Sequence, residues 1–212
     1  MFVATDRYLG PAEVLEVRED RLRVSSPAGV REAQLALAVF YQARPGDVVL
    51  LVAEEEAYVI GVLKGSVPFL TDLSRHLPLT IEMDFLNLTR FGREGRVSVA
   101  MDLSVPIEGR SVIIVEDIVD TGLTLATLRK MLKARGASTV STVALLDKAT
   151  RRIVDVPVEH RGFEVGDEFL LGYGMDWQGR YRNVPSIWAV MDLSVLTSDP
   201  DAFGRRAFAQ LQ

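Results

Sequence analysis

Residues 112–125 read VIIVEDIVDTGLTL, and this stretch decides which fold the chain can adopt. A run of apolar residues ends at two adjacent carboxylates, Glu116 and Asp117, and a third acid, Asp120, follows shortly after. The residues at 121–124, Thr-Gly-Leu-Thr, then lead into a helical pattern. A buried strand followed by a glycine turn and a helix is the unit of an α/β fold, in which ligands bind at the carboxyl ends of the strands. We therefore expect a ligand site at this turn.

The same order of strand, turn and helix recurs from residue 57 onwards. Continuous or alternating apolar runs predict strands, whereas apolar positions spaced three and four residues apart predict helices. The expected strands lie at residues 58–63, 80–88, 96–103, 111–115, 141–146, 169–174 and 186–190, and the expected helices at 67–77 and 124–136. This alternation predicts an α/β fold with a mostly parallel sheet flanked by helices.

The first 52 residues have a different pattern. Residues 14–17 and 21–24 alternate loosely between apolar and polar and are separated by three charged residues, which indicates a β-hairpin. Residues 33–40 alternate too, but the stretch from residue 31 is rich in good helix formers, so a helix at 31–43 is an open alternative. We expect two parts: a β-rich N-terminal segment of unknown role at 1–52, and the α/β domain at 53–212.

The composition restricts the class of function. The chain has 212 residues, a formal net charge of −5 and no cysteine. A negative net charge disfavours binding to nucleic acid, and the lack of cysteine excludes disulfides and thiolate metal sites. The sequence shows neither an apolar stretch long enough to span a bilayer nor the basic-then-apolar start of a secretory signal. We expect a cytoplasmic protein that binds neither nucleic acid nor a membrane.

The residues of the deciding stretch suit a phosphorylated sugar. At 121–124, backbone N–H groups at the start of the expected helix can bind a phosphate, and the two threonine hydroxyls add donors. Glu116 and Asp117 can accept hydrogen bonds from two neighbouring sugar hydroxyls, or can bind Mg²⁺ through oxygen. Asp120 then lies where a general base would act on a group held above the sugar ring.

The stretch VIIVEDIVDTGLTL resembles the motif that binds 5-phosphoribosyl 1-pyrophosphate (PRPP) in the type I phosphoribosyltransferases. Other segments resemble the hypoxanthine-guanine branch of that family, in the order expected for it. They are GVLKGSVPFLTDL, MDFLNL, LLDK and GFEVGDEFLLGYGMDWQGRYRNVP. The similarity extends from about Tyr58 to Met191, and it implies the type I phosphoribosyltransferase fold.

The resemblance also implies a role for each matching residue. Those matching the ribose- and phosphate-binding positions are Glu116, Asp117, Thr121, Gly122, Leu123 and Thr124, and those matching the pyrophosphate-binding positions are Leu63, Lys64, Gly65 and Arg182. Those matching the purine-binding positions are Lys148, Phe169 and Leu170, and the family's Mg²⁺ ligands correspond to Glu116, Asp117 and Asp176. In the family, the loop that matches residues 63–65 carries a cis peptide. Trp177 could form a wall of the purine pocket or simply pack against its neighbours.

These roles imply a Mg²⁺-dependent purine-salvage enzyme. It would convert hypoxanthine, and guanine as well, with PRPP to IMP or GMP and pyrophosphate, and Asp120 would remove the purine N7 proton. A transferase that prefers xanthine is one alternative, and a nucleotide-sensing regulator of the same fold with weak or no catalysis is another. The presence of both Asp120 and Lys148 favours the enzyme, because a sensor needs no general base. The family also implies a homodimer or homotetramer.

Two features depart from the family pattern. The mobile loop of the family carries a Ser-Tyr pair and a long polar stretch, whereas residues 89–96 are shorter and have Arg90 and Phe91 at the place of that pair. Phe91 cannot donate a hydroxyl, so a different closure of the site is expected. The N-terminal helix typical of the family has no match within residues 1–52.

Overall fold

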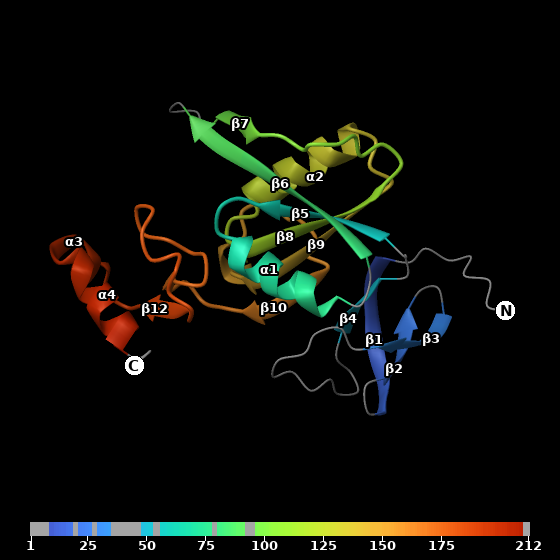
Figure 1. Cartoon of the computed structure of the whole chain (residues 1–212), viewed down its shortest axis with the longest axis horizontal. Helices are drawn as coiled ribbons and strands as arrows, with labels where there is room; N and C mark the ends of the chain where they lie inside the picture. The colour runs from blue at the N-terminus through green and yellow to red at the C-terminus, as the bar shows by residue number, and fades with distance from the viewer. Residues whose placement is uncertain are drawn as a thin grey trace.

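The computed structural model describes residues 9–18, 21–26, 29–34, 48–52, 56–77, 80–91 and 96–209 of the chain. Its largest sheet contains β5 (Glu56–Val62), β6 (Thr80–Phe91), β7 (Arg96–Met101), β8 (Ser111–Val119), β9 (Thr139–Asp147) and β10 (His160–Glu164). The strand order is β10-β9-β8-β5-β6-β7. All neighbours pair in parallel except β7, which is antiparallel to β6. The predicted, mostly parallel sheet is confirmed, and the deciding stretch lies near its middle (Figure 1).

Strand β8 has apolar side chains on both faces because a helix covers each face of the sheet. Ile113 and Val115 belong to the core beneath helix α1 (Val67–His76). Ile114 belongs to the core beneath helix α2 (Leu123–Ala134) on the opposite face. Successive residues of a strand point to opposite faces, so a strand that is covered twice needs an uninterrupted apolar run.

The N-terminal residues form a separate antiparallel sheet with the order β3-β2-β1-β4. Its strands are β1 (Leu9–Arg18), β2 (Arg21–Ser26), β3 (Gly29–Gln34) and β4 (Val48–Val52). Val14 of β1 is paired with Val24 of β2, and both are buried, so the predicted hairpin is confirmed. The alternative of a helix is wrong for residues 31–34, which belong to β3, and residues 35–43 lie outside the described part. The division into residues 1–52 and 53–212 stays a prediction.

The hairpin of β6 and β7 is longer than expected on its first strand. The strand was expected to end at residue 88, but the register pairs Thr89 with Ser98 and Phe91 with Arg96. The side chains of Thr89 and Ser98 also approach each other, with 3.1 Å between their Oγ atoms. Three residues beyond the expected end of the strand, 89–91, therefore continue the ladder.

The C-terminal part differs most from the prediction. Strands β11 (Phe169–Leu171) and β12 (Trp188–Val190) form a two-stranded sheet, and helices α3 (Leu193–Ser198) and α4 (Pro200–Ala209) follow it. The strand expected at 169–174 ends early because Gly172 and Tyr173 have positive φ angles, +87° and 49°, which a strand does not contain. These helices and the N-terminal sheet lie on opposite sides of the central sheet (Figure 1). None of the helices in the described residues is both long and apolar enough to cross a membrane.

Candidate active site

The turn between β8 and α2 is shaped by a glycine that no other residue could replace without strain. Gly122 has a φ of +81°, and a Cβ added to it would lie 2.8 Å from both Arg152 Cδ and Val154 O. The N–H groups of Ile153 and Val154 donate to Thr121 O, at 3.0 and 3.2 Å, and hold the turn in place. The N-terminus of α2 follows this turn, and N–H groups at a helix N-terminus favour an anion, so the predicted phosphate site stays a prediction at this place.

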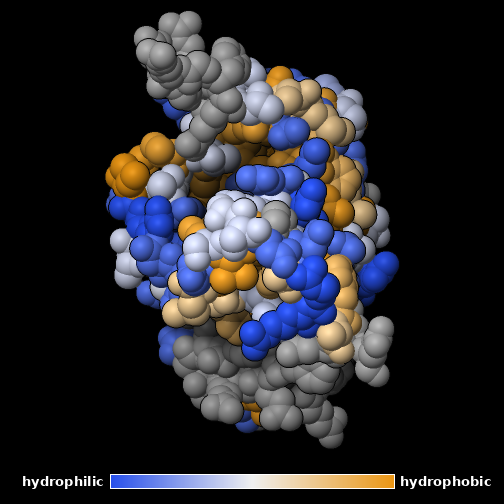
Figure 2. Space-filling model, turned by 90° about the vertical axis from the view of Figure 1, so that its left-hand side faces the viewer, coloured by the Kyte–Doolittle hydropathy of each residue, from blue (hydrophilic) through white to orange (hydrophobic). Residues whose placement is uncertain are grey.

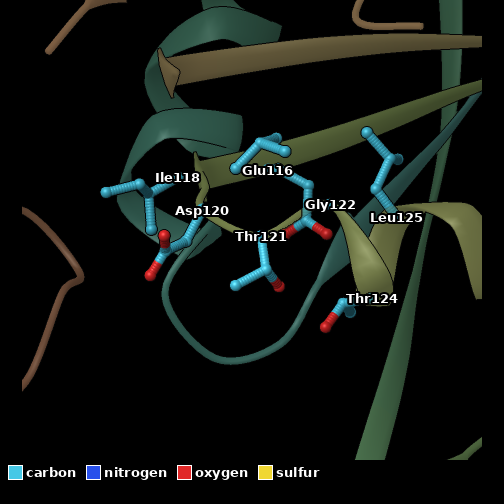
Figure 3. Close-up of a pocket in the computed structure, with 8 residues that line it drawn as sticks. Glu116, Ile118, Asp120, Thr121, Gly122, Thr124 and Leu125 are labelled. Atoms are coloured by element: carbon cyan, nitrogen blue, oxygen red, sulfur yellow. The ribbon is translucent and has the colours of Figure 1, made fainter. Parts of the chain in front are cut away.

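Figure 3 shows how the side chains of this turn are arranged. Asp120, Thr121 and Thr124 point to the same side of the loop, whereas Leu125 points away from it and is buried in the core. The cavity at the turn has a volume of about 100 Å³ and is lined by Glu116, Ile118, Val119, Asp120, Thr121, Gly122, Thr124 and Leu125. The structure thus brings the predicted base and the predicted phosphate loop together.

A second cavity, of about 270 Å³, adjoins the first and shares Glu116, Ile118 and Thr124 with it. It is lined in addition by Val62, Leu63, Lys64, Gly65, Leu88, Asp117, Asp176 and Arg182. The predicted pyrophosphate-binding and metal-binding residues therefore face one hollow beside the phosphate loop. Figure 2 shows the face of the molecule formed by the left-hand side of Figure 1, where the surface is hollowed and apolar atoms are visible in the depth.

The loop at 63–65 is held close to the carboxylates. The Leu63–Lys64 peptide is cis, as the family resemblance implied. A Cβ on Gly65 would lie 1.7 Å from Asp117 Oδ2, so only glycine lets the loop approach that carboxylate. On its other side, a Cβ on Gly174, which has a φ of +99°, would lie 1.9 Å from Gly65 O. The loop is therefore enclosed between Asp117 and the turn that follows β11.

The two carboxylates at the end of β8 differ in their surroundings. Glu116 is buried, and burial raises its pKa well above the ordinary value, with a further rise from the charge of Asp117. Burial also raises the pKa of Asp117, and hydrogen bonds from the backbone N–H groups of Asp117 and Ile118, followed by the charge of Arg182, oppose that rise. A buried carboxyl next to another acid keeps its proton more readily. Burial therefore disfavours the charged form of Glu116 more than that of Asp117.

Arg182 and Asp176 form an ion pair in the lining of the larger cavity. Arg182 Nη2 lies 2.6 Å from Asp176 Oδ1, and its Nη1 donates to Gly174 O at 2.6 Å. The other carboxylate oxygen of Asp176 accepts a hydrogen bond of 2.6 Å from Gly179 N. Both side chains are thus fixed by the same turn, next to the loop at 63–65.

The predicted purine residues lie together, outside the lining of these two cavities. Lys148 follows β9 and is buried, and its Nζ donates to Glu168 O at 2.5 Å. Phe169 and Leu170 come directly after that carbonyl and are half-buried. The ring of Trp177 meets the Phe169 ring edge to face, with 5.5 Å between centroids. Trp177 therefore packs against the residue predicted to stack on the purine.

A family model described as a phosphoribosyl transferase domain matches residues 48–178. The chain belongs to the phosphoribosyltransferase family. This match begins in β4 of the N-terminal sheet and ends before helices α3 and α4.

Individual relatives of this phosphoribosyltransferase are hypoxanthine-guanine or hypoxanthine phosphoribosyltransferases. The hypoxanthine-guanine phosphoribosyltransferase of Bacillus subtilis (strain 168) is 44% identical over 132 residues, which are 60% of this chain and 73% of that protein. The crystal structure of a hypoxanthine-guanine phosphoribosyltransferase from Bacillus anthracis, with HEPES in its active site, is 41% identical with a TM-score of 0.62 and covers 64% of this chain and 82% of that one. The Trypanosoma cruzi hypoxanthine phosphoribosyltransferase with the product IMP is 36% identical with a TM-score of 0.62, and the match covers 66% of this chain and 77% of that one. The predicted resemblance and fold are confirmed.

Two acidic residues of this phosphoribosyltransferase suit a Mg²⁺ ion that is also bound by substrate phosphates. In the described part of the chain, no three carboxylate or imidazole side chains converge into a group that could hold a metal ion by themselves. Asp117 and Asp176 nevertheless line the same cavity. Mg²⁺ in enzymes is commonly bound by one or two carboxylates, substrate phosphates and water, which is the arrangement these residues suit.

Several residues that shape the site were not predicted. Ile118 lies between the acids and lines both cavities. Arg152 donates from Nη1 to Asp120 O at 3.0 Å and from Nη2 to the buried carboxylate of Asp147. Arg151 lies beside Asp120, with 2.9 Å between Arg151 Nε and Asp120 Oδ1. The only local signal was the Arg-Arg pair shortly after Lys148, and nothing in the pattern indicated which loop it would contact.

Proposed function

We propose that the protein transfers ribose 5-phosphate from PRPP to a 6-oxopurine, forming IMP from hypoxanthine and GMP from guanine, with release of pyrophosphate. The observation that carries this proposal is the meeting of two loops at one edge of the sheet. The loop at 121–124 can bind a phosphate, and the loop at 63–65 lies with Arg182 around the adjoining cavity. The relatives named for the same reaction support it.

Each end of PRPP has a matching group in this arrangement. The N–H groups at the start of α2 and the hydroxyls of Thr121 and Thr124 would bind the 5-phosphate. Glu116 and Asp117 would accept hydrogen bonds from the two ribose hydroxyls. Backbone groups of the loop at 63–65, with the side chains of Lys64 and Arg182, would bind the pyrophosphate. A planar guanidinium is suited to the paired oxygens of that group.

The transfer exchanges one bond at the anomeric carbon for another. The purine N9 forms a bond to the anomeric carbon while the bond between that carbon and a pyrophosphate oxygen breaks. The N7 proton of the purine is transferred to Asp120. Lys148 would donate to the purine O6, Phe169 would stack on its face, and the backbone at Leu170 would meet its edge. Charge on the departing pyrophosphate is stabilised by Lys64 and Arg182.

Mg²⁺ completes this proposal. Asp117 and Asp176 would hold it, with Glu116 as the third predicted ligand, and the bound ion supplies positive charge beside the pyrophosphate. We also propose that residues 53–212 form the catalytic domain, with the N-terminal sheet as a separate part. A cytoplasmic location and a homodimer or homotetramer remain predictions from the sequence and the family.

The test is a comparison of three bases with PRPP and Mg²⁺. Hypoxanthine should yield IMP and guanine should yield GMP, whereas xanthine should react more slowly. Rates are followed by radiolabelled product, with a reaction that lacks PRPP as the control. A rate with xanthine above both others would indicate the xanthine-preferring alternative. Tight GMP binding without any product would indicate the sensing alternative instead.

A further inference from the structure

One guanidinium connects the two halves of the candidate site. Arg151 Nε lies 2.9 Å from Asp120 Oδ1, and its Nη1 donates to Asp167 Oδ1. Asp120 belongs to the turn between β8 and α2, whereas Asp167 lies two residues before Phe169, in the loop that leads into β11. Arg151 therefore joins the loop predicted to bind PRPP to the loop predicted to bind the purine.

The contact occupies one particular oxygen of Asp120. The Oδ1 atom has almost no exposed surface and accepts no hydrogen bond from the described residues, so Arg151 holds it through an ion pair; the side chain as a whole is 44% exposed. The carboxylate oxygen that can face a ligand is therefore Oδ2. A carboxylate whose first oxygen is fixed by a cation presents its second oxygen in a defined direction, as an outer partner does for a catalytic base in other sites.

Arg151 is itself held by a short, well-bonded turn. It ends the 3₁₀ helix at Ala149–Arg151, and its N–H donates to Lys148 O at 2.9 Å. The next residue, Arg152, binds the backbone oxygen of Asp120 and the side chain of Asp147. The turn is thus fastened to the same loop through both arginines, and Lys148 begins it. The backbone of Arg151 is held by this turn, and its guanidinium is held by Asp120 and Asp167.

We propose that Arg151 is a positioning residue for the purine half of the reaction. By pairing with Asp120 Oδ1, Arg151 directs Oδ2 towards the N7 proton of the purine. By binding Asp167 as well, it holds Asp120 at a fixed position relative to the loop that carries Phe169. This inference rests on the proposed function, because it presumes Asp120 to be the acceptor of that proton. Arg151 touches neither substrate in this role, so its loss should affect the chemical step more than the binding of PRPP.

The experiment compares Arg151→Gln with the unchanged enzyme. We expect kcat/KM for hypoxanthine to fall by about 10- to 100-fold, because a general base contributes about 100-fold or more only when it is well placed. The dissociation constant for PRPP with Mg²⁺, titrated through tryptophan fluorescence, should stay within about 2-fold of the original value, since only the orientation of Asp120 is changed. Arg151→Lys keeps the charge but not the planar fork and should restore part of the rate.

The matched control is Arg135→Gln. Arg135 makes a two-pronged ion pair with Asp102, at 2.5 and 2.9 Å, and it is exposed to a similar degree at the far end of α2. This variant should keep the original kinetics. Asp167→Asn should reproduce part of the Arg151→Gln loss and add little to it when the two are combined, because both act through one contact.

The outcomes separate this inference from the proposed function. Equal kinetics of Arg151→Gln and Arg135→Gln would overturn the positioning role, and so would a loss of PRPP binding as large as the loss of turnover. Asp120→Asn is measured in the same series. If that variant loses turnover while Arg151→Gln does not, only the inference on Arg151 fails. If Asp120→Asn turns over normally, the general-base assignment fails and the inference fails with it.

Discussion

Asp120 is the residue on which the proposed chemistry depends most directly. Asp120→Asn keeps the size of the side chain and an oxygen near Arg151 but removes the group that accepts a proton. We expect kcat to fall by about 100-fold or more, because this is the typical contribution of a general base. Binding of IMP, measured by titration, should be retained. A parallel loss of nucleotide binding and turnover would contradict the assignment.

Lys148 should govern the choice of purine. It is buried and held by Glu168 O, so its ammonium is directed towards the residues that precede Phe169. We expect Lys148→Ala to raise KM for hypoxanthine by about 10-fold, because one charge-assisted hydrogen bond contributes roughly 1.5 kcal/mol. KM for PRPP should change little. Lys130→Ala, which removes an exposed lysine on α2, serves as the control, and an unchanged purine preference in Lys148→Ala would refute the role.

Which site residues could be predicted depended on how close together they lie in the sequence. The acids of β8 and the glycine turn adjoin in the sequence, so their chemistry was predictable from one stretch. The contact between Asp120 and Arg151 arises only after β8 and β9 pair and the turn beyond β9 folds back. Asp120 and Arg151 have no regular spacing in the sequence that a pattern could reveal, because only the tertiary fold brings them together.

At the scale of elements, strand β10 shows why some of the structure was not predicted. Its five residues are mostly exposed, and Phe163 is among the exposed hydrophobic side chains. A strand at the edge of a sheet that buries little has no apolar face to impose an alternating pattern. Strand β8, by contrast, is covered on both faces, and its apolar run predicted it correctly. The buried strand could therefore be predicted from its sequence, whereas the exposed one could not.

Helix α4 was also missed, and it has a structural consequence for the site. Phe203 of α4 meets the ring of Tyr181 edge to face at 4.9 Å and that of Trp188 at 5.8 Å between centroids. Tyr181 directly precedes Arg182, and its φ is 72°. The helix thus supports the loop that carries the predicted pyrophosphate-binding arginine.

Removing that support should be measurable. We expect Phe203→Ala to lower the free energy of unfolding by roughly 2 kcal/mol, less than for a fully buried phenylalanine, because Phe203 is only partly buried. KM for PRPP should rise as the loop loosens around Arg182. Phe208→Ala removes an exposed ring from the same helix and should have a smaller effect on both quantities. Equal effects of the two variants, followed by urea unfolding and kinetics, would show that α4 does not support the loop.

At the scale of the whole molecule, the site collects residues from widely separated parts of the chain at one edge of the sheet. The loop after β5, the turn after β8 and the segment around β11 each supply part of it. The parallel order of β5, β8 and β9 makes this possible, because parallel strands end at the same edge. That convergence followed from the predicted alternation of strands and helices. The position of the N-terminal sheet did not, since no pattern in residues 1–52 indicates what it packs against.

The stability of the whole fold should carry a pH dependence from His160. Burial lowers the pKa of His160 to about 4, with a smaller opposing effect from Glu159, and Nε2 is buried with no hydrogen-bond partner among the described residues. The ordinary value is 6.5, so between the two values the unfolded chain binds the proton and the folded protein does not. The stabilisation from neutral His160 is therefore present above pH 6.5 and is lost as the pH falls towards 4.

The test separates this group from the acids that titrate nearby. Between about pH 7.5 and about pH 5, the free energy of unfolding should fall by roughly 1–2 kcal/mol more in the original protein than in His160→Gln, which has no proton to gain. Urea unfolding at both pH values gives the two differences, and carboxyl groups contribute equally to each and cancel. Burial would raise the pKa of Asp84, but hydrogen bonds from Tyr58 and Ser104 to its carboxylate lower it. Asp84 therefore gains its proton below this pH range. Identical pH dependence in the two proteins would mean that His160 is as accessible to protons in the folded state as in the unfolded chain.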